Sequence, residues 1–301
     1  MKMEIRTQAL MSAPWRDYLE LCKPRVVALM MLTAVVGMVL ADASLNDASA
    51  IVWGNIGIAL LAGSAAAINH VVDRKIDSVM ARTMRRPLAE GRLDNKSALL
   101  FALILALLGM VVLLTWVNAL TAWLTLASLI GYAVVYTGFL KRATPQNIVL
   151  GGLAGAAPPL LGWTAITNEV HPHALLLVLI IFAWTPPHFW ALAVHRKAEY
   201  AKAGIPMLPV THGDAYTKLH ILLYTLMLFA ASMLPFITGM CGVIYFVTAL
   251  VLGGRFLVWA IVLLRDSRKF AAIKTFHFSI IYLMGLFVSL IVDHYLPLTW
   301  N

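Results

Sequence analysis

Charged side chains are scarce in this chain. Asp, Glu, Lys and Arg make up only 12% of its 301 residues, about half of what soluble domains carry, whereas 61% of the residues are hydrophobic. This balance excludes an ordinary soluble globular domain and indicates an integral membrane protein. Cysteine is nearly absent as well. Cys22 and Cys241 fall near opposite faces of the membrane in the topology derived below, so we expect no disulfide framework.

Long hydrophobic runs, by contrast, are frequent. A bilayer core about 30 Å thick needs about 20 apolar residues per helix. No linker or low-complexity segment divides the chain, so we predict an all-α polytopic membrane protein with a single domain, residues 1–301. Nine apolar stretches define its transmembrane helices: 25–41, 51–71, 98–116, 121–139, 147–163, 173–194, 219–239, 241–264 and 276–293.

Positive charge gathers on one side of these spans. All of the 23 Lys and Arg residues except Arg255 fall at the N-terminal end or in the connections after the second, fourth, sixth and eighth spans. Because such residues accumulate on the cytoplasmic side, we predict a cytoplasmic N-terminus and a C-terminus outside. The net charge of +9 is then a topology signal, and we expect no nucleic-acid partner.

The N-terminal segment, residues 1–24, has no continuous apolar run of the kind found in a cleaved signal peptide. It also carries three acidic residues, which is unlike an organelle transit sequence. We therefore predict a bacterial plasma (inner) membrane as the location. Two long cytoplasmic loops, 72–97 and 195–218, hold most of the unusual chemistry.

The stretch NHVVDRKID, at the end of the second span, carries the first candidate site. Asn69, Asp73 and Asp77 are spaced i, i+4 and i+8, which places them on one stripe of a helix. Two carboxylates and an amide oxygen are hard ligands that suit Mg²⁺, whose other positions water and substrate phosphates fill. The stripe therefore predicts a Mg²⁺-phosphate site.

Basic residues surround this stripe. Their donors match phosphate oxygens, although acids and bases in a solvated loop also simply neutralise each other. Asn69 and Asp73 lie close to the apolar span, where polar groups are costly and usually functional, and this favours the phosphate site. The basic residues are Arg74, Lys75, Arg82, Arg85 and Arg86.

A second segment combines a basic pair with small residues and prolines. Lys141 and Arg142 alone would be topology anchors, and Asn147 is a candidate polar wall of the same pocket. The span that follows is expected to have a thin face for close helix approach, and a break. The residues responsible are Gly151, Gly152, Gly155, Pro158 and Pro159.

The sixth span carries a buried histidine, His188, after two prolines and close to Trp184. Such a residue is often structural, but imidazole in an aromatic apolar cavity also binds haem iron. Arg255 is a candidate for an anionic group such as a propionate, and His277 lies near the start of the last span. The second loop adds polar residues of uncertain role: Arg196, Lys197, Glu199 and Tyr200.

Several strings make the chain similar to the haem O synthases of the UbiA superfamily of intramembrane prenyltransferases. They are the Asn-x-x-x-Asp-x-x-x-Asp motif, DSVMARTMRRPLAEGR, LKRATPQNIVLGGLAGAAPPLLGW, WTPPHFWALAV and YAKAGIPMLPV. The resemblance implies that farnesyl diphosphate and haem B react to give haem O, with Mg²⁺ required. It further implies that Asn69, Asp73 and Asp77 bind Mg²⁺-diphosphate, and it matches basic positions at Arg82, Arg85, Arg86, Lys141 and Arg142.

One departure concerns the second long loop. Quinone-type members of the superfamily carry a second acidic motif there, whereas this chain has HRKAEYAKAG, with Glu199 where haem O synthases typically have Asp. Two alternatives remain: a prenyltransferase acting on a quinone-precursor ring and, from another class, a membrane transporter. The expected partners are the lipid bilayer, haem B, farnesyl diphosphate and, by analogy, a terminal oxidase or its assembly factors.

Overall fold

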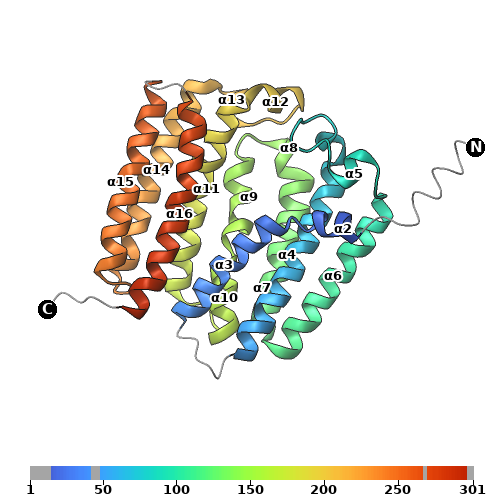
Figure 1. The fold of residues 1–301 in the computed structure, drawn as a ribbon, viewed down its shortest axis with the longest axis horizontal. Coiled ribbons are helices and arrows are strands. Elements are labelled where there is room, and N and C mark those ends of the chain that lie inside the picture. The colour runs from blue at the N-terminus through green and yellow to red at the C-terminus, as the bar shows by residue number, and fades with distance from the viewer. Residues whose placement is uncertain (1–14, 42–47, 267–269, 297–301) are drawn as a thin grey trace, which may run out of the picture.

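The protein is a bundle of membrane-length helices (Figure 1). A computed structural model describes residues 15–41, 48–266 and 270–296, and these contain helices and no strand. Eight helices are long and apolar enough to cross a membrane, and a ninth span results if α2 (Trp15–Leu21) and α3 (Pro24–Leu40), bent by 52°, count as one. The predicted all-α polytopic fold is confirmed. The predicted segment 1–24 lies partly outside the described residues.

Each predicted span corresponds to one of these helices. Three short helices, α5 (Pro87–Glu90), α12 (Lys197–Lys202) and α13 (Leu208–Thr211), lie at one end of the bundle, at the top of Figure 1. Six of the eight spans are single helices: α4 (Ala48–Asp77), α6 (Asn95–Trp116), α11 (Pro172–His195), α14 (Gly213–Ile237), α15 (Val243–Leu264) and α16 (Ala271–Tyr295). The other two are composite: α7 (Ala119–Ile130), η2 (Gly131–Leu140) and α8 (Lys141–Ala143) form one, and α9 (Asn147–Ala156) and α10 (Pro158–Thr167) form the other.

Polar residues set the starts of two spans. Asp94 accepts a hydrogen bond from the Ser97 N–H at 2.7 Å and so caps α6. That backbone hydrogen bond lowers the pKa of Asp94 below its usual range. Asn118 caps α7 in the same way, accepting from the Thr121 N–H at 2.8 Å.

Among the boundaries that differ from the sequence prediction, two differ by six residues. Helix α4 continues past the expected end at residue 71 to Asp77, because the carboxylates of its last turns find cationic partners. Helix α14 begins at Gly213 instead of residue 219, and its Lys218 pairs with Asp266 at 2.6 Å. Each predicted loop therefore contributes helical turns that continue the bundle.

Glycines allow close contact between helices, as expected for membrane packing. A Cβ at Gly162 of α10 would lie 2.0 Å from the carbonyl oxygen of Ala34 in α3. On α9, a Cβ at Gly151 would meet the Tyr136 ring at 2.2 Å, whereas Gly155 has open space. The face of α9 that was predicted to allow close helix approach is therefore present at Gly151 but does not extend to Gly155. The predicted break separates α9 from α10 at Pro158.

Candidate active site

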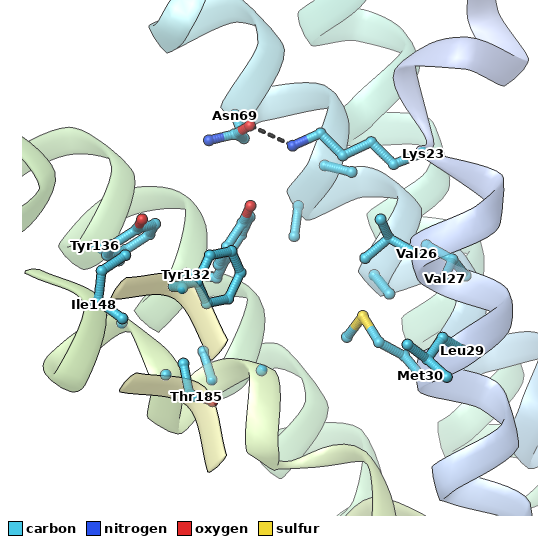
Figure 2. A pocket seen from close by; sticks show the side chains of 18 of the residues that line it. Lys23, Val26, Val27, Leu29, Met30, Asn69, Tyr132, Tyr136, Ile148 and Thr185 are labelled. Atoms are coloured by element: carbon cyan, nitrogen blue, oxygen red, sulfur yellow. Dashed lines mark hydrogen bonds between the residues drawn. The ribbon is translucent and has the colours of Figure 1, made fainter. Parts of the chain in front are cut away.

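A cavity of about 620 Å³ opens inside the bundle, with walls from α3, α4, η2, α9, α11 and α16. One end is polar and holds the residues of the predicted phosphate site. The remainder is apolar and includes Met30 of α3 and Ile148 of α9, while Tyr132 and Tyr136 face it from η2 (Figure 2). A site of this form suits a ligand with an anionic head and a hydrocarbon body.

The acidic stripe lies at the polar end of this cavity. Asn69, Asp73 and Asp77 occupy successive turns of α4, line the cavity, and are each less than 5% exposed. Buried carboxylates need cationic or hydrogen-bonding partners. The surrounding helices provide them.

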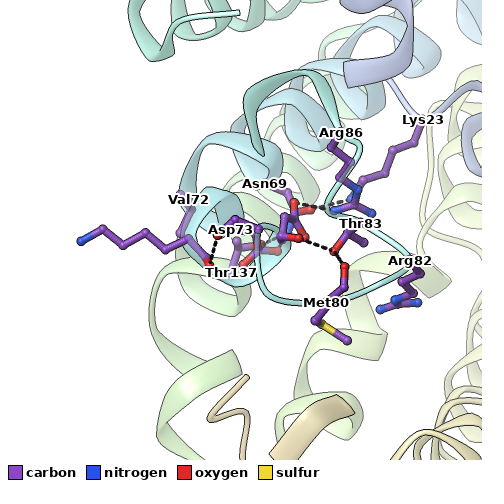
Figure 3. A network of polar contacts seen from close by, with 12 residues as sticks. Lys23, Asn69, Val72, Asp73, Met80, Arg82, Thr83, Arg86 and Thr137 are labelled. Atoms are coloured by element: carbon purple, nitrogen blue, oxygen red, sulfur yellow. Dashed lines mark hydrogen bonds and ion pairs between the residues drawn. The ribbon is translucent and has the colours of Figure 1, made fainter. Parts of the chain in front are cut away.

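Asn69 is the centre of a polar network (Figure 3). Its Nδ2 donates to Asp73 Oδ2 at 2.9 Å and to Thr137 Oγ1 at 3.1 Å, and its Oδ1 accepts from Lys23 Nζ at 2.5 Å. Lys141 Nζ lies 2.5 Å from Asp73 Oδ2. The network therefore joins α3, α4, η2 and α8 at one point.

Asp77 and the loop after α4 complete the polar end. Arg86 Nη1 lies 2.7 Å from Asp77 Oδ2, and the Thr83 hydroxyl donates to the Asp77 carbonyl at 3.1 Å. Arg82 lies over the Tyr200 ring, 6.0 Å from its centroid, and both line the cavity. Five cations and two carboxylates thus line this cavity, and the excess positive charge favours an anion. The cations are Lys23, Arg25, Arg82, Arg86 and Lys141.

The donor set fits a Mg²⁺ ion that is shared with a substrate. Asp73 Oδ1 is buried and has no hydrogen-bond partner, so it is free to act as a ligand. The described residues contain no group of three His, Cys, Asp or Glu side chains that would hold a metal alone. An ion held by Asp73 and Asp77, with Asn69 beside them, would need oxygens from phosphate and water, which is how Mg²⁺ is usually bound.

Two members of the network were not anticipated from the sequence. Lys23 precedes α3 with φ 51° and ψ 59°, a left-handed conformation that is uncommon for a residue with a side chain. Thr137 lies in η2, a π-helix in which its hydroxyl donates to the Tyr132 carbonyl at 2.8 Å. Lys23 resembles a topology anchor, and Thr137 sits in an apolar span, so no pattern marks either residue. π-Helical turns are frequent at functional sites.

The apolar part of the cavity has an aromatic wall. His188 stacks between Trp184, with ring centroids 4.1 Å apart, and Phe276, 4.6 Å apart. His188 Nδ1 lies 2.7 Å from Ser279 Oγ, and Trp184 Nε1 donates to the Ser279 carbonyl. Ser279 contacts His188 from a different helix, α16, and no pattern in the sequence marks this contact.

Several candidate residues do not reach this cavity. Arg74 points toward α6, where its Nη1 lies 3.4 Å from Asn95 Oδ1. Arg196 pairs with Glu199, and Lys197 pairs with Asp214. Five further candidate residues also lie outside the lining, although Tyr200 from the same loop as Glu199 belongs to it. Those outside include Lys75, Arg85, Arg142 and, on the outer faces of α15 and α16, Arg255 and His277.

Comparison with known sequences adds relatives to this geometry. Residues 30–290 match the model of the UbiA prenyltransferase family. A protoheme IX farnesyltransferase from Hahella chejuensis is 77% identical over 288 residues, covering 96% of both chains. The protein of that name from Marinobacter nauticus is 71% identical and covers 93% of both chains.

Solved structures share the fold. A digeranylgeranylglyceryl phosphate synthase superposes with a TM-score of 0.78 at 19% identity, covering 93% of this chain and 98% of that one. A UbiA homologue from Archaeoglobus fulgidus bound to GPP and Mg²⁺ gives 0.63 at 16% identity, covering 91% and 99%. Because the family match spans most of the chain and close relatives cover nearly all of it, the chain belongs to the UbiA prenyltransferase family.

Proposed function

We propose that this chain is a haem farnesyltransferase, which transfers the farnesyl group of farnesyl diphosphate to a vinyl group of haem B and so produces haem O. The observation that carries the proposal is one cavity that has two carboxylates and several Lys and Arg side chains at one end and an aromatic wall around His188 elsewhere. The names of relatives at 67–77% identity supply the substrates.

The polar end is suited to hold the diphosphate. Breaking the allylic C–O bond places negative charge on the leaving diphosphate, and preorganised cations stabilise charge where it develops. Lys23, Lys141 and Arg86 are already fixed there by Asn69, Asp73 and Asp77. A Mg²⁺ ion held by Asp73 and Asp77 would supply further stabilisation of that charge.

The apolar part is suited to the farnesyl chain and its cation. Tyr136, Trp184 and Phe189 line the cavity, and each ring that faces the cation would contribute about 0.5–2 kcal/mol. An enclosed apolar wall also keeps water away from the cation before the acceptor reacts.

The hydrogen bonds around His188 support a role in holding the acceptor. When Ser279 Oγ donates its one hydrogen to the Phe276 carbonyl, 2.6 Å away, it accepts from His188 Nδ1–H. His188 Nε2 then keeps its lone pair, which is the form that binds haem iron. Ser279 thereby acts as a positioning residue for His188.

The reaction balances with water as the third reactant. The farnesyl C1–O bond breaks, and the terminal vinyl carbon of haem B bonds to C1, which leaves positive charge on the vinyl carbon beside the ring. Water adds its hydroxyl to that carbon and releases a proton. The products are haem O, diphosphate and H⁺. We place the polar end at the cytoplasmic face of a bacterial inner membrane, because the basic residues gather at that end.

The direct test incubates the purified protein with haem B and farnesyl diphosphate, with Mg²⁺ or with EDTA, and analyses the haem by mass spectrometry. We expect hydroxyethylfarnesyl haem with Mg²⁺ and none with EDTA. If haem stayed unmodified while a quinone-precursor ring was prenylated, the assignment of haem as acceptor would be refuted. The assignment of the polar end as the diphosphate site would still hold. No consumption of the diphosphate with either acceptor would refute the prenyltransferase assignment.

A further inference from the structure

A second recess lies beside the active-site cavity, at the same end of the bundle. Its volume is about 280 Å³, and it is open to the surroundings. Three segments that are distant in sequence form it: the end of α4, the end of α8, and the turn after α12. Its lining residues are Lys75, Ile76, Val79, Arg142, Lys202, Ala203 and Gly204.

The charge of this recess is entirely positive. Lys75, Arg142 and Lys202 are exposed, and none of them has an acidic partner among the described residues. Arg142 makes one hydrogen bond, from Nη2 to the Val72 carbonyl at 3.2 Å, which fixes the guanidinium at the recess. Three cations that line one recess without compensation favour an anion with several acceptor oxygens.

The acids of the neighbouring segments do not neutralise these cations. Asp73 and Asp77 pair with Lys141 and Arg86 inside the cavity. Glu199, on α12, pairs with Arg196. The recess is therefore a cationic surface that the protein itself leaves unsatisfied.

The position of the recess indicates the source of the anion. Lys75 lies in the last turn of the span that ends at Asp77, and Arg142 lies in the last turn of the span that ends at Ala143. The ends of spans lie at the depth of lipid headgroups. Ile76 and the 44% exposed Val79 add apolar surface between the cations. A phosphate group on an apolar molecule matches this combination.

We propose that this recess binds the phosphate of an anionic phospholipid headgroup. Such a lipid would bridge three segments that also carry cavity residues, because Lys75 is close to Asp77, Arg142 follows Lys141, and Lys202 follows Tyr200 on α12. Headgroup binding then holds the polar end of the cavity together. This inference concerns lipid binding and holds whether or not haem is the acceptor.

The test compares lipids on the detergent-solubilised protein by native mass spectrometry. We expect phosphatidylglycerol to bind in preference to phosphatidylcholine, whose headgroup also carries a positive charge. In the variant Lys75→Gln/Arg142→Gln/Lys202→Gln, we expect the relative affinity for phosphatidylglycerol to fall about five-fold for each cation removed. The same titrations with inorganic phosphate test whether the recess binds the free anion instead of the lipid.

A matched control removes the same charges elsewhere. Lys96, Arg265 and Lys274 are exposed at the ends of other spans and lie outside the recess, and their triple Gln variant should keep the preference. If both triple variants lost the preference for phosphatidylglycerol to the same extent, the preference would depend only on net charge, and the proposal would be overturned. So would equal binding of the two lipids by the unaltered protein, or inorganic phosphate displacing phosphatidylglycerol at similar concentrations.

Discussion

The two oxygens of the Asp73 carboxylate have different surroundings. Oδ2 accepts from Asn69 and pairs with Lys141, whereas Oδ1 is buried without a partner. Leaving a buried carboxylate oxygen unsatisfied costs free energy, so such an atom in a folded protein calls for an explanation. A ligand position that is filled only in the substrate complex explains it.

We therefore expect Asp73→Ala and Asp77→Ala to lose turnover by about 100-fold or more, since each removes charge stabilisation at the leaving group. Haem O formation by mass spectrometry gives the rate, and size-exclusion chromatography gives the folded state. The control is Asp94→Asn, because Asp94 is exposed and asparagine retains the cap of α6. Full activity of a folded Asp73→Ala protein would refute the metal and diphosphate role.

Ser279 provides a second prediction for single residues. Ser279→Ala removes the acceptor that fixes the His188 tautomer, and one lost hydrogen bond corresponds to about five-fold weaker haem binding. The Soret spectrum of bound haem should shift in Ser279→Ala and more strongly in His188→Ala.

The control for this experiment is Ser289→Ala. Ser289 is a buried serine of the same helix, and its hydroxyl donates to the carbonyl three residues earlier, as Ser279 does. Ser289 lies outside the cavity lining. A Soret spectrum unchanged in both His188→Ala and Ser279→Ala would assign His188 to packing alone.

At the scale of elements, η2 carries the cavity wall next to α4. Two residues of this π-helix, Tyr132 and Tyr136, line the cavity. Thr137 ties η2 to α4 through Asn69 Nδ2. We expect Thr137→Val to slow turnover about five-fold with little change in size or stability.

The same kinetic measurement on Thr225→Val supplies the comparison. Thr225 is equally buried, and its hydroxyl donates only to the Ile221 carbonyl of its own helix. If both variants slowed turnover to the same extent, the tie between η2 and α4 would have no part in positioning Asn69.

Helices α3 and α10 pack backbone against backbone at Gly162. Gly162→Ala would place a methyl group 2.0 Å from the Ala34 carbonyl oxygen, and the two backbones would have to separate. Overpacking of this kind usually costs about 1–3 kcal/mol, so the melting temperature in detergent should fall. Gly254→Ala has open space and should melt like the unaltered protein; equal melting of both variants would contradict the close contact.

For the whole molecule, hydrophobic run length predicted the spanning helices, which number eight in the described residues, or nine if α2 and α3 count as one span. The spacing of Asn69, Asp73 and Asp77 predicted one polar stripe. Both are local properties of the chain, since a helix and its faces follow from nearby residues. The cavity depends on contacts between distant segments. That is why Lys23, Thr137 and Ser279 escaped prediction, while Arg255 and His277, plausible by position along the chain, lie away from it.

The arrangement of charge also predicts how the molecule sits in the membrane. The ends of α4, α8 and α15 and the short helix α12 carry basic residues at one end of the bundle, where the polar end of the cavity lies. Basic residues favour the cytoplasmic side, and nine spans, with α2 and α3 counted as one, would place the two termini on opposite sides.

Fusion of reporters to the C-terminus tests this orientation. Alkaline phosphatase, which requires the oxidising outside compartment, should be active, and a green fluorescent protein, which requires the cytoplasm, should remain dark. The reverse pattern would put the C-terminus inside. It would then require either eight crossings, with α2 and α3 forming a re-entrant segment, or a diphosphate site that faces outward. Haem O formation from farnesyl diphosphate added to sealed inverted vesicles distinguishes these two cases, because only an inward-facing site is accessible there.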